Sequence, residues 1–223
     1  CVLELGGSNA FIILEDANLE KAVATAVNAR MQNAGQSCIA AKRFLVHENI
    51  VEEFVAKLKV AIQNLKTGNP FDKEMQIGSL ARVDLAEELE AQVQKSIQMG
   101  ADLIVGGTRK EAFYEPTILA NVTTEMPVFN EETFGPVASI ITFKTLEEAI
   151  ELSNQSEFGL GVSIFTQDID FIKTKISAFN EGAVFINEMV KSDPRLPFGG
   201  IKKSGYGREL AEDGIKEFVN VKT

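Results

Sequence analysis

One cysteine in the sequence has neighbours that suit a reactive thiol. Cys38 follows the segment Asn33–Ser37, between the end of one predicted helix and the start of a predicted strand. The small residues Gly35 and Ala40 leave room for a substrate to reach the sulfur. A free cysteine is more often a buried apolar residue, so position alone favours a structural role. A thiol becomes a nucleophile only beside a base or in a favourable electrostatic field.

The candidate base is a carboxylate. His47, the only histidine, ends a predicted strand, and nothing in the sequence indicates that it lies near Cys38. One histidine and two distant cysteines cannot form a zinc site. Glu4 lies in Leu-Glu-Leu-Gly-Gly, an apolar setting that would raise its pKa towards the range useful for activating water. A solvated glutamate at a strand edge is the equal alternative. The 34 residues that separate Glu4 from Cys38 match one strand and one helix, which predicts that both lie at the same end of a parallel sheet.

Two further stretches have unusual composition. Glu131–Pro136 places an acid two residues before an aromatic residue in a Gly-Pro turn, and Pro197–Gly207 is a long glycine-rich loop. The loop has no strand–turn–helix context with dinucleotide spacing, so we reject it as a nucleotide motif. The simpler explanation for the glycines of this loop is that they allow close approach of the backbone.

Short apolar runs alternate with amphipathic segments along the chain. The pattern predicts an α/β fold with a mostly parallel sheet flanked by helices, because apolar runs outnumber clean alternations. The strands are expected at Phe11–Leu14, Arg43–His47, Leu103–Val105, Val137–Phe143, Val162–Phe165 and Ala183–Ile186. Helices are expected from Leu19, from a capping box at Asn49 and Glu52, around Leu85–Ile97, from a capping box at Thr145 and Glu148, and from about Asp168.

Composition narrows the class of protein. The chain has 223 residues, 45% of them hydrophobic, and its net charge of −10 argues against nucleic acid as a partner. No apolar run reaches the roughly 20 residues of a membrane span. Two cysteines without a disulfide framework favour a reducing, cytoplasmic location. The first residues resemble neither an initiator region nor a signal peptide, so we expect the chain to be a piece of a longer protein.

Four motifs in order resemble those of the NAD(P)-dependent aldehyde dehydrogenase superfamily. They are Glu-Leu-Gly-Gly at 4–7, Gly-Gln-Ser-Cys at 35–38, Glu-Thr-Phe-Gly-Pro at 132–136, and Pro-Phe-Gly-Gly with Lys-Ser-Gly at 197–205. The resemblance runs from the first residue to the last.

The resemblance implies a role for each matching residue. Cys38 would attack the aldehyde, its own N–H helping to hold the oxyanion, and Glu4 would activate the water that hydrolyses the thioester. Glu132, Phe134 and the backbone of Leu5 would contact the nicotinamide half of NAD or NADP. Phe198 would line the substrate funnel, and Asn187 would give structural support.

The same resemblance implies a domain division. Residues 1–206 would be the catalytic domain, and 207–223 a C-terminal tail with an oligomerisation strand over Glu217–Lys222, in a homodimer or homotetramer of the full-length protein. The family's cofactor-binding domain precedes Glu4 and is absent from this chain, and with it the residues that separate NAD from NADP. We therefore expect the chain alone to be inactive as a dehydrogenase; steady NADH production by it would contradict this.

The small-molecule aldehyde implied is succinate semialdehyde. Lys-Ser-Asp-Pro-Arg at 191–195, and its spacing to Pro-Phe-Gly-Gly, resemble the bacterial succinate-semialdehyde dehydrogenases. One subgroup has a carboxylate-binding Arg six residues before the nucleophile, where this chain has Gln32. Arg195 or Lys191 would then supply the positive charge at the funnel mouth; a solvated loop is the alternative.

Two other functions stay open from the sequence. A CoA-acylating dehydrogenase would keep the fold but transfer the acyl group to a thiol; Glu4 argues against it, because that reaction needs no water-activating base. An inactive, truncated binding or assembly module is the second. Formation of acyl-CoA tests the first, and thiol-dependent ester hydrolysis tests the second.

Overall fold

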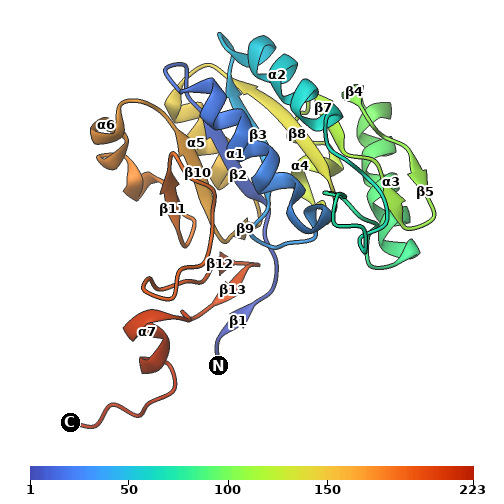
Figure 1. The fold of residues 1–223 in the computed structure, drawn as a ribbon. Helices are drawn as coiled ribbons and strands as arrows, with labels where there is room; N and C mark the ends of the chain where they lie inside the picture. Colours follow the sequence, from blue (N-terminus) through green and yellow to red (C-terminus); the bar gives the residue numbers. More distant parts are fainter.

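A seven-stranded sheet forms the centre of the chain in the computed structural model, which describes residues 1–223 (Figure 1). Every neighbouring pair of strands is parallel except β4 with β7. The order across the sheet is β11 (Val184–Ile186), β10 (Val162–Phe165), β2 (Asn9–Ile13), β3 (Ala41–His47), β8 (Val137–Phe143), β7 (Thr117–Ala120) and β4 (Asp102–Val105). The predicted α/β fold with a mostly parallel sheet is confirmed.

Helices cover both faces of this sheet. α1 (Leu19–Met31) and α2 (Val51–Gln63) pack together on one face, and α5 (Leu146–Asn154) packs on β2 and β8 from the other (Figure 1). The chain moves one way across the sheet from β2 to β3 and the opposite way from β8 to β10. Right-handed crossovers in opposite directions place their helices on opposite faces.

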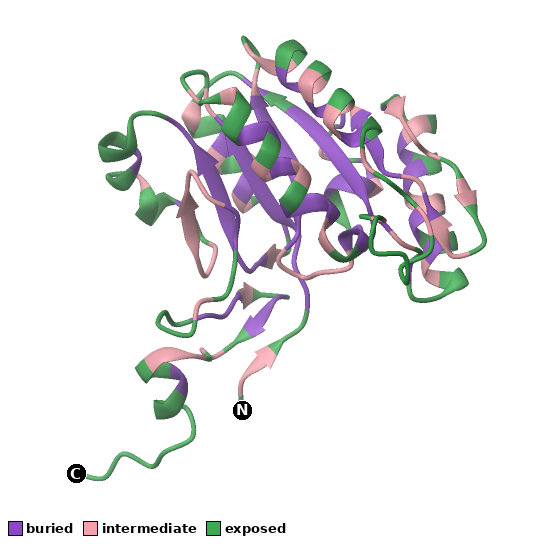
Figure 2. Cartoon of the chain, viewed as in Figure 1, coloured by how far each residue is buried: buried purple, intermediate pink, exposed green.

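Burial on both faces explains why the central strands read as apolar runs. All residues of β2 and all but the last of β3 are buried (Figure 2). The ring of Phe11 in β2 lies 5.2 Å from that of Phe44 in β3 and 4.6 Å from that of Phe165 in β10, centroid to centroid. Such aromatic contacts stabilise the packing of neighbouring strands beyond the effect of area burial.

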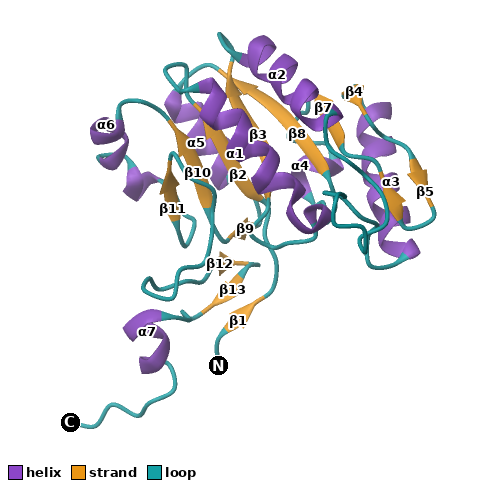
Figure 3. Ribbon diagram, viewed as in Figure 1, coloured by secondary structure: helices purple, strands orange, loops and turns teal.

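Smaller elements complete the fold. α3 (Val83–Gln98) packs on α4 (Pro127–Asn130). None of the helices combines the length and apolar character needed to cross a bilayer. Two-residue strands pair outside the main sheet, below it in Figure 3: β1 (Leu3–Glu4) with β13 (Gly205–Tyr206), and β12 (Ile201–Lys202) with β9 (Phe158–Gly159). The rest are β5 (Arg109–Lys110), β6 (Phe113–Tyr114), α6 (Ile169–Lys173), α7 (Ala211–Lys216) and the 3-10 turns η1 (Gln32–Gly35) and η2 (Ile176–Ala178).

The structure differs from the sequence predictions in several elements. Residues 217–222 are exposed and form no strand within the single chain; the strand expected there belongs to contacts between subunits and stays a prediction. β7 was not predicted, although it lies between β8 and β4. Asn49 does not cap α2: the cap position is Ile50, and the Asn49 amide instead donates to Glu15 Oε1 at 2.7 Å.

The N-cap predicted at Thr145 is present, and its contribution to the free energy of unfolding can be tested. Thr145 accepts from the Glu148 N–H at the start of α5, so Thr145→Ala should destabilise the fold by about 1 kcal/mol. Asn49→Ala, the matched control, removes only an exposed side-chain bond and should change stability much less. Urea unfolding of the full-length protein measures both. Equal losses for the two variants would contradict the assignment.

Candidate active site

The predicted thiol and acid segments lie at the same end of the sheet. Cys38 precedes β3, Gly7 follows Glu4 and precedes β2, and Glu132 precedes β8, so all three lie at the amino ends of adjacent parallel strands. His47 is at the opposite end of β3, where its Nε2 lies 3.1 Å from the Lys144 carbonyl. A Cys–His pair is therefore excluded. No group of three or more histidine, cysteine or acidic side chains is placed to hold a metal ion.

Cys38 occupies a tight turn that follows a segment with strained backbone. The Ala40 N–H donates to the Ser37 carbonyl at 3.2 Å, which places Cys38 at the first inner position of a β-turn. Just before it, Asn33 and Ala34 have left-handed φ values of 51° and 53°, conformations that cost energy for residues with a Cβ. Such strain concentrates at functional sites. The thiol is half-buried and packs against an apolar cluster of Leu160, Val190 and Phe198.

A buried lysine that the sequence analysis missed holds this turn. The side chain of Lys42 is fully buried, and its Nζ donates to the carbonyls of Ser37 at 3.0 Å, Cys38 at 3.2 Å and Ala40 at 3.4 Å. The same Nζ lies 3.3 Å from Glu132 Oε1. The sequence did contain a signal for this role: a charged residue at the start of an apolar strand is expected to be buried, and a buried lysine needs partners.

The charges beneath the turn are predominantly positive. Burial, followed by the charge of Arg30, lowers the pKa of Lys42 to about 7, and the Glu132 carboxylate opposes this shift. Burial also lowers the pKa of Arg30, a second buried cation that donates to the Gly35 carbonyl at 2.6 Å. Two cations facing one carboxylate favour negative charge that develops at the turn above them.

Two glycines allow the chain after Glu4 to pass between the Cys38 turn and Glu132. A Cβ on Gly7 would lie 2.6 Å from the Cys38 carbonyl oxygen, and one on Gly6, at φ +152°, would lie 2.6 Å from Glu132 Oε2. Without side chains they bring the Gly7 N–H to 3.0 Å from Glu132 Oε1. The Gly-Gly pair of the first motif is therefore required for close approach.

The residues expected to contact a cofactor lie around this point. The Glu132 side chain is 21% exposed, and the ring of Phe134, itself partly exposed, has its centroid 6.0 Å from Lys42 Nζ. Leu5 is exposed, and its N–H donates to the Ser204 carbonyl at 3.1 Å. An exposed aromatic face, an exposed aliphatic residue and a carboxylate acceptor beside the thiol turn fit the ring, the backbone contact and the ribose hydroxyls of a nicotinamide nucleotide.

Glu4 is more exposed than the sequence suggested. It lies in β1, a two-residue strand outside the main sheet and paired with Gly205, and the prediction of an apolar setting is wrong. Although the residue is exposed, its carboxyl loses part of its hydration, and this loss and the nearby Glu209 carboxylate raise its pKa. The Gly200 N–H and Arg208 oppose the shift. Gly200 lies in the same glycine-rich loop as Phe198, and Glu209 follows it, so residues 198–209 lie against both the Glu4 carboxyl and the apolar cluster that packs on Cys38.

The predicted substrate residues are only partly brought together. Phe198 is buried and lines a cavity of about 410 Å³ with Phe185 and Lys191. Arg195 does not line it: its guanidinium bonds Asp193 at 2.9 and 2.6 Å, and these bonds hold the pKa of Asp193 well below its usual range. Lys191 is likewise paired, at 3.0 Å from Glu188.

Gln32 and Asn187 have other surroundings. Gln32 lines a separate cavity of about 260 Å³ beside α1, and its buried Nε2 has no hydrogen-bond partner. Asn187, at a left-handed φ of 56°, donates to the Thr166 carbonyl at 2.8 Å and accepts from the Thr166 N–H at 3.0 Å. The side chain of Asn187 thus extends the pairing of β10 and β11, as expected of structural support.

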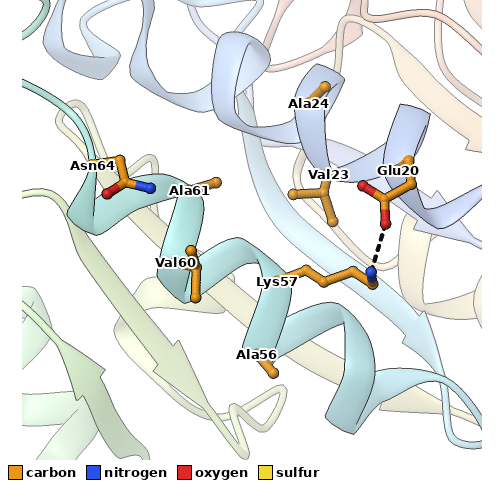
Figure 4. A pocket seen from close by; sticks show the side chains of 8 residues that line it. All are labelled: Glu20, Val23, Ala24, Ala56, Lys57, Val60, Ala61 and Asn64. Atoms are coloured by element: carbon orange, nitrogen blue, oxygen red, sulfur yellow. Dashed lines mark hydrogen bonds and ion pairs between the residues drawn. The ribbon is translucent and has the colours of Figure 1, made fainter.

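A groove of about 570 Å³ between α1 and α2 is not part of this site. Apolar residues such as Val23 and Val60 line it, and its polar contact is the Lys57–Glu20 ion pair at 2.5 Å (Figure 4). The groove contains no nucleophile and no carboxylate free of an ion pair, so we assign it no chemistry.

The fold and site together define an α/β domain with a half-buried, free cysteine at the amino ends of its strands. The family model for the aldehyde dehydrogenase family matches residues 1–223, and the chain belongs to that family. It is 50% identical to the succinate semialdehyde dehydrogenase [NAD(P)+] Sad of Escherichia coli (strain K12), over 100% of this chain and 49% of that protein. It is 51% identical to the probable succinate-semialdehyde dehydrogenase [NADP(+)] of Synechocystis sp. (strain ATCC 27184 / PCC 6803 / Kazusa), over 100% of this chain and 50% of that protein.

A solved structure agrees with these relatives. The crystal structure of succinate-semialdehyde dehydrogenase from Burkholderia pseudomallei matches with a TM-score of 0.94 and 37% identity, over 97% of this chain and 45% of that one. The chain spans about half the length of the curated relatives it matches.

The close approach at Gly7 gives a direct test of the site geometry. In the full-length protein, Gly7→Ala should displace the Cys38 turn and lower kcat for aldehyde oxidation by about 100-fold, as ångström-scale misplacement of a reacting group does. Gly100→Ala is the control: it has a left-handed φ of +110° but no atom within 4 Å of the added Cβ, so it should lower stability only. Aldehyde oxidation by the Gly7 variant at the rate of this control would show that the contact does not position the thiol.

Proposed function

We propose that this chain is the catalytic half of an NAD(P)-dependent aldehyde dehydrogenase that oxidises an aldehyde through a thioester on Cys38. The observation that carries the proposal is the half-buried Cys38 turn, whose Cys38 N–H has no acceptor in the chain. The turn lies above two buried cations and beside Glu132. The names of the relatives, all aldehyde-oxidising enzymes, support the reaction class.

The first step forms a bond between sulfur and carbon. The Cys38 thiolate adds to the aldehyde carbon, and the carbonyl electron pair moves to the oxygen, which becomes an oxyanion. The unbonded Cys38 N–H supplies one donor for that oxygen. A preorganised donor of this kind contributes roughly 10²- to 10³-fold in rate.

The cofactor would be held by residues of this chain next to the thiol. Glu132 would accept from the nicotinamide ribose, Phe134 would contact the ring and the backbone of Leu5 would bond the carboxamide. When bound there, the nicotinamide supplies the hydride acceptor, so that loss of hydride from the sulfur-bound carbon leaves a thioester on Cys38. Glu132 is bonded to the Gly7 N–H in this chain, so these residues combine a fixed carboxylate with exposed apolar surface.

Glu4 completes the reaction as general base. It takes a proton from water as the water oxygen adds to the thioester carbon; the carbon–sulfur bond then breaks, releasing a carboxylic acid and the Cys38 thiolate. A base acts only when ionised. Because the pKa of Glu4 is raised, hydrolysis should increase with pH over a range above that of an ordinary glutamate.

The substrate proposal is succinate semialdehyde, an aldehyde with a distal carboxylate. The relatives carry that substrate in their names, and the loop Lys191–Arg195 borders the cavity lined by Phe198. The Arg195 guanidinium is 85% exposed, so its hydrogen-bonding capacity beyond Asp193 faces solvent. The homodimer or homotetramer and the cytoplasmic location of the full-length protein stay predictions.

The reaction is tested by separating acylation from hydrolysis in the full-length protein. Cys38→Ala should abolish both the initial burst and the steady production of NAD(P)H. Glu4→Gln should keep the burst and slow the steady rate by about 10²- to 10⁴-fold, because only the base is lost. Cys1→Ala, the exposed second cysteine, should change neither. A burst that survives Cys38→Ala would refute the assignment of the nucleophile.

The role of Arg195 is tested by comparing two aldehydes. Arg195→Ala should raise KM for succinate semialdehyde roughly two- to fivefold, since an exposed ion pair contributes about 1 kcal/mol or less, and should leave KM for a neutral aldehyde unchanged. Arg82 is a matched control, because it bonds Asp84 at the same 2.9 and 2.6 Å but lies at the start of α3. An equal effect of Arg195→Ala on both aldehydes would remove Arg195 from the substrate site.

A further inference from the structure

The carbonyl groups of the Cys38 turn are all bonded from one side. Lys42 Nζ donates to the carbonyls of residues 37, 38 and 40, and Asn9 Nδ2 donates to the Ile39 carbonyl at 3.0 Å. Both donors belong to buried residues at the amino ends of β3 and β2. Four successive carbonyls are therefore directed towards the sheet.

The orientation of the carbonyls determines that of the N–H groups. A trans peptide directs its C=O and N–H in opposite directions, and the chain has no cis peptide. Because the Ser37 carbonyl is directed at buried Lys42, the Cys38 N–H of the same peptide is directed away from the sheet. That N–H has no acceptor within the chain, and neither has the N–H of Ile39.

We propose that Lys42 is a positioning residue for the oxyanion: by bonding the Ser37 and Cys38 carbonyls it turns the Cys38 N–H outwards to the substrate oxygen. This inference rests on the proposed function. In this role Lys42 acts through the peptide that it orients, separately from the electrostatic interaction between its charge and that of Cys38. Its contact with Glu132 at 3.3 Å joins the same ammonium to the proposed cofactor contact.

The charge of Lys42 makes it suited to this task. An ammonium offers three N–H groups, and here it faces three carbonyls and one carboxylate oxygen at 3.0 to 3.4 Å. Bonds from a charged donor are stronger than those between neutral groups. A neutral residue of similar length would leave the Ser37 carbonyl with only the 3.2 Å bond from the Ala40 N–H, so the direction of the Cys38 N–H would be less firmly held.

The experiment compares two reactions of the same sulfur in the full-length protein. Aldehyde oxidation develops an oxyanion, whereas alkylation by iodoacetamide at a saturated carbon does not. Lys42→Met should lower kcat for aldehyde oxidation by about 10- to 100-fold while leaving the alkylation rate of Cys38, compared at the high-pH plateau where the thiol is fully ionised, close to the wild-type value. Lys42→Gln, which keeps two N–H donors and guards against a folding failure of the methionine variant, should fall between them.

Arg43 provides the matched control for loss of a buried cation from β3. Its guanidinium is also fully buried, but it bonds the carbonyls of Ser8, Leu152 and Ser153 rather than those of the turn. Arg43→Met should lower the thermal midpoint and leave the ratio of oxidation to alkylation unchanged. Parallel loss of oxidation and alkylation in both Lys42 variants, or no loss of oxidation, would overturn the role of Lys42. Wild-type protein that is alkylated at Cys38 but forms no NAD(P)H would instead overturn the proposed function.

Discussion

The site depends on one buried ammonium group at the start of β3. Lys42 bonds the carbonyls of the Cys38 turn and contacts Glu132, so the turn of the proposed nucleophile and the carboxylate beside it are held by the same atom. Burying a lysine is costly unless several acceptors surround it, and the reduced pKa of about 7 reflects that cost. The acceptors that stabilise the charge are the groups whose direction the chemistry requires, so the structural and functional demands on Lys42 coincide.

The order of strands in the sheet brings the other parts of the site next to the Cys38 turn. Parallel order places the segments before β2, β3 and β8 side by side at one edge, although they are far apart in sequence. Gly6 and Gly7 then let the chain from Glu4 pass within contact distance of both the Cys38 carbonyl and Glu132. A side chain at either glycine would separate these segments, so the glycines matter for distance as much as for conformational freedom.

Sequence predicted the parts of this arrangement that depend on local pattern. The central strands were recognisable because burial on both faces makes them continuously apolar, and the common end of Glu4 and Cys38 followed from one strand–helix unit. Features that depend on tertiary contacts could not be predicted from the sequence. The role of Lys42 can be recognised only once β3 is known to be a central strand. Asn49 bonds Glu15 instead of capping α2. The exposure of Glu4 follows from the position of β1 outside the main sheet. Residues 217–222 lack a strand neighbour within the chain, which no local pattern reveals.

The central claim concerns the direction of one peptide group, and a crystal structure of the full-length enzyme with an aldehyde adduct on Cys38 measures it. The account predicts that the adduct oxygen lies about 2.7–3.1 Å from the Cys38 nitrogen, with the Ser37 carbonyl still bonded to Lys42 Nζ. An adduct oxygen directed away from that nitrogen, or a Ser37 carbonyl rotated off Lys42, would contradict it.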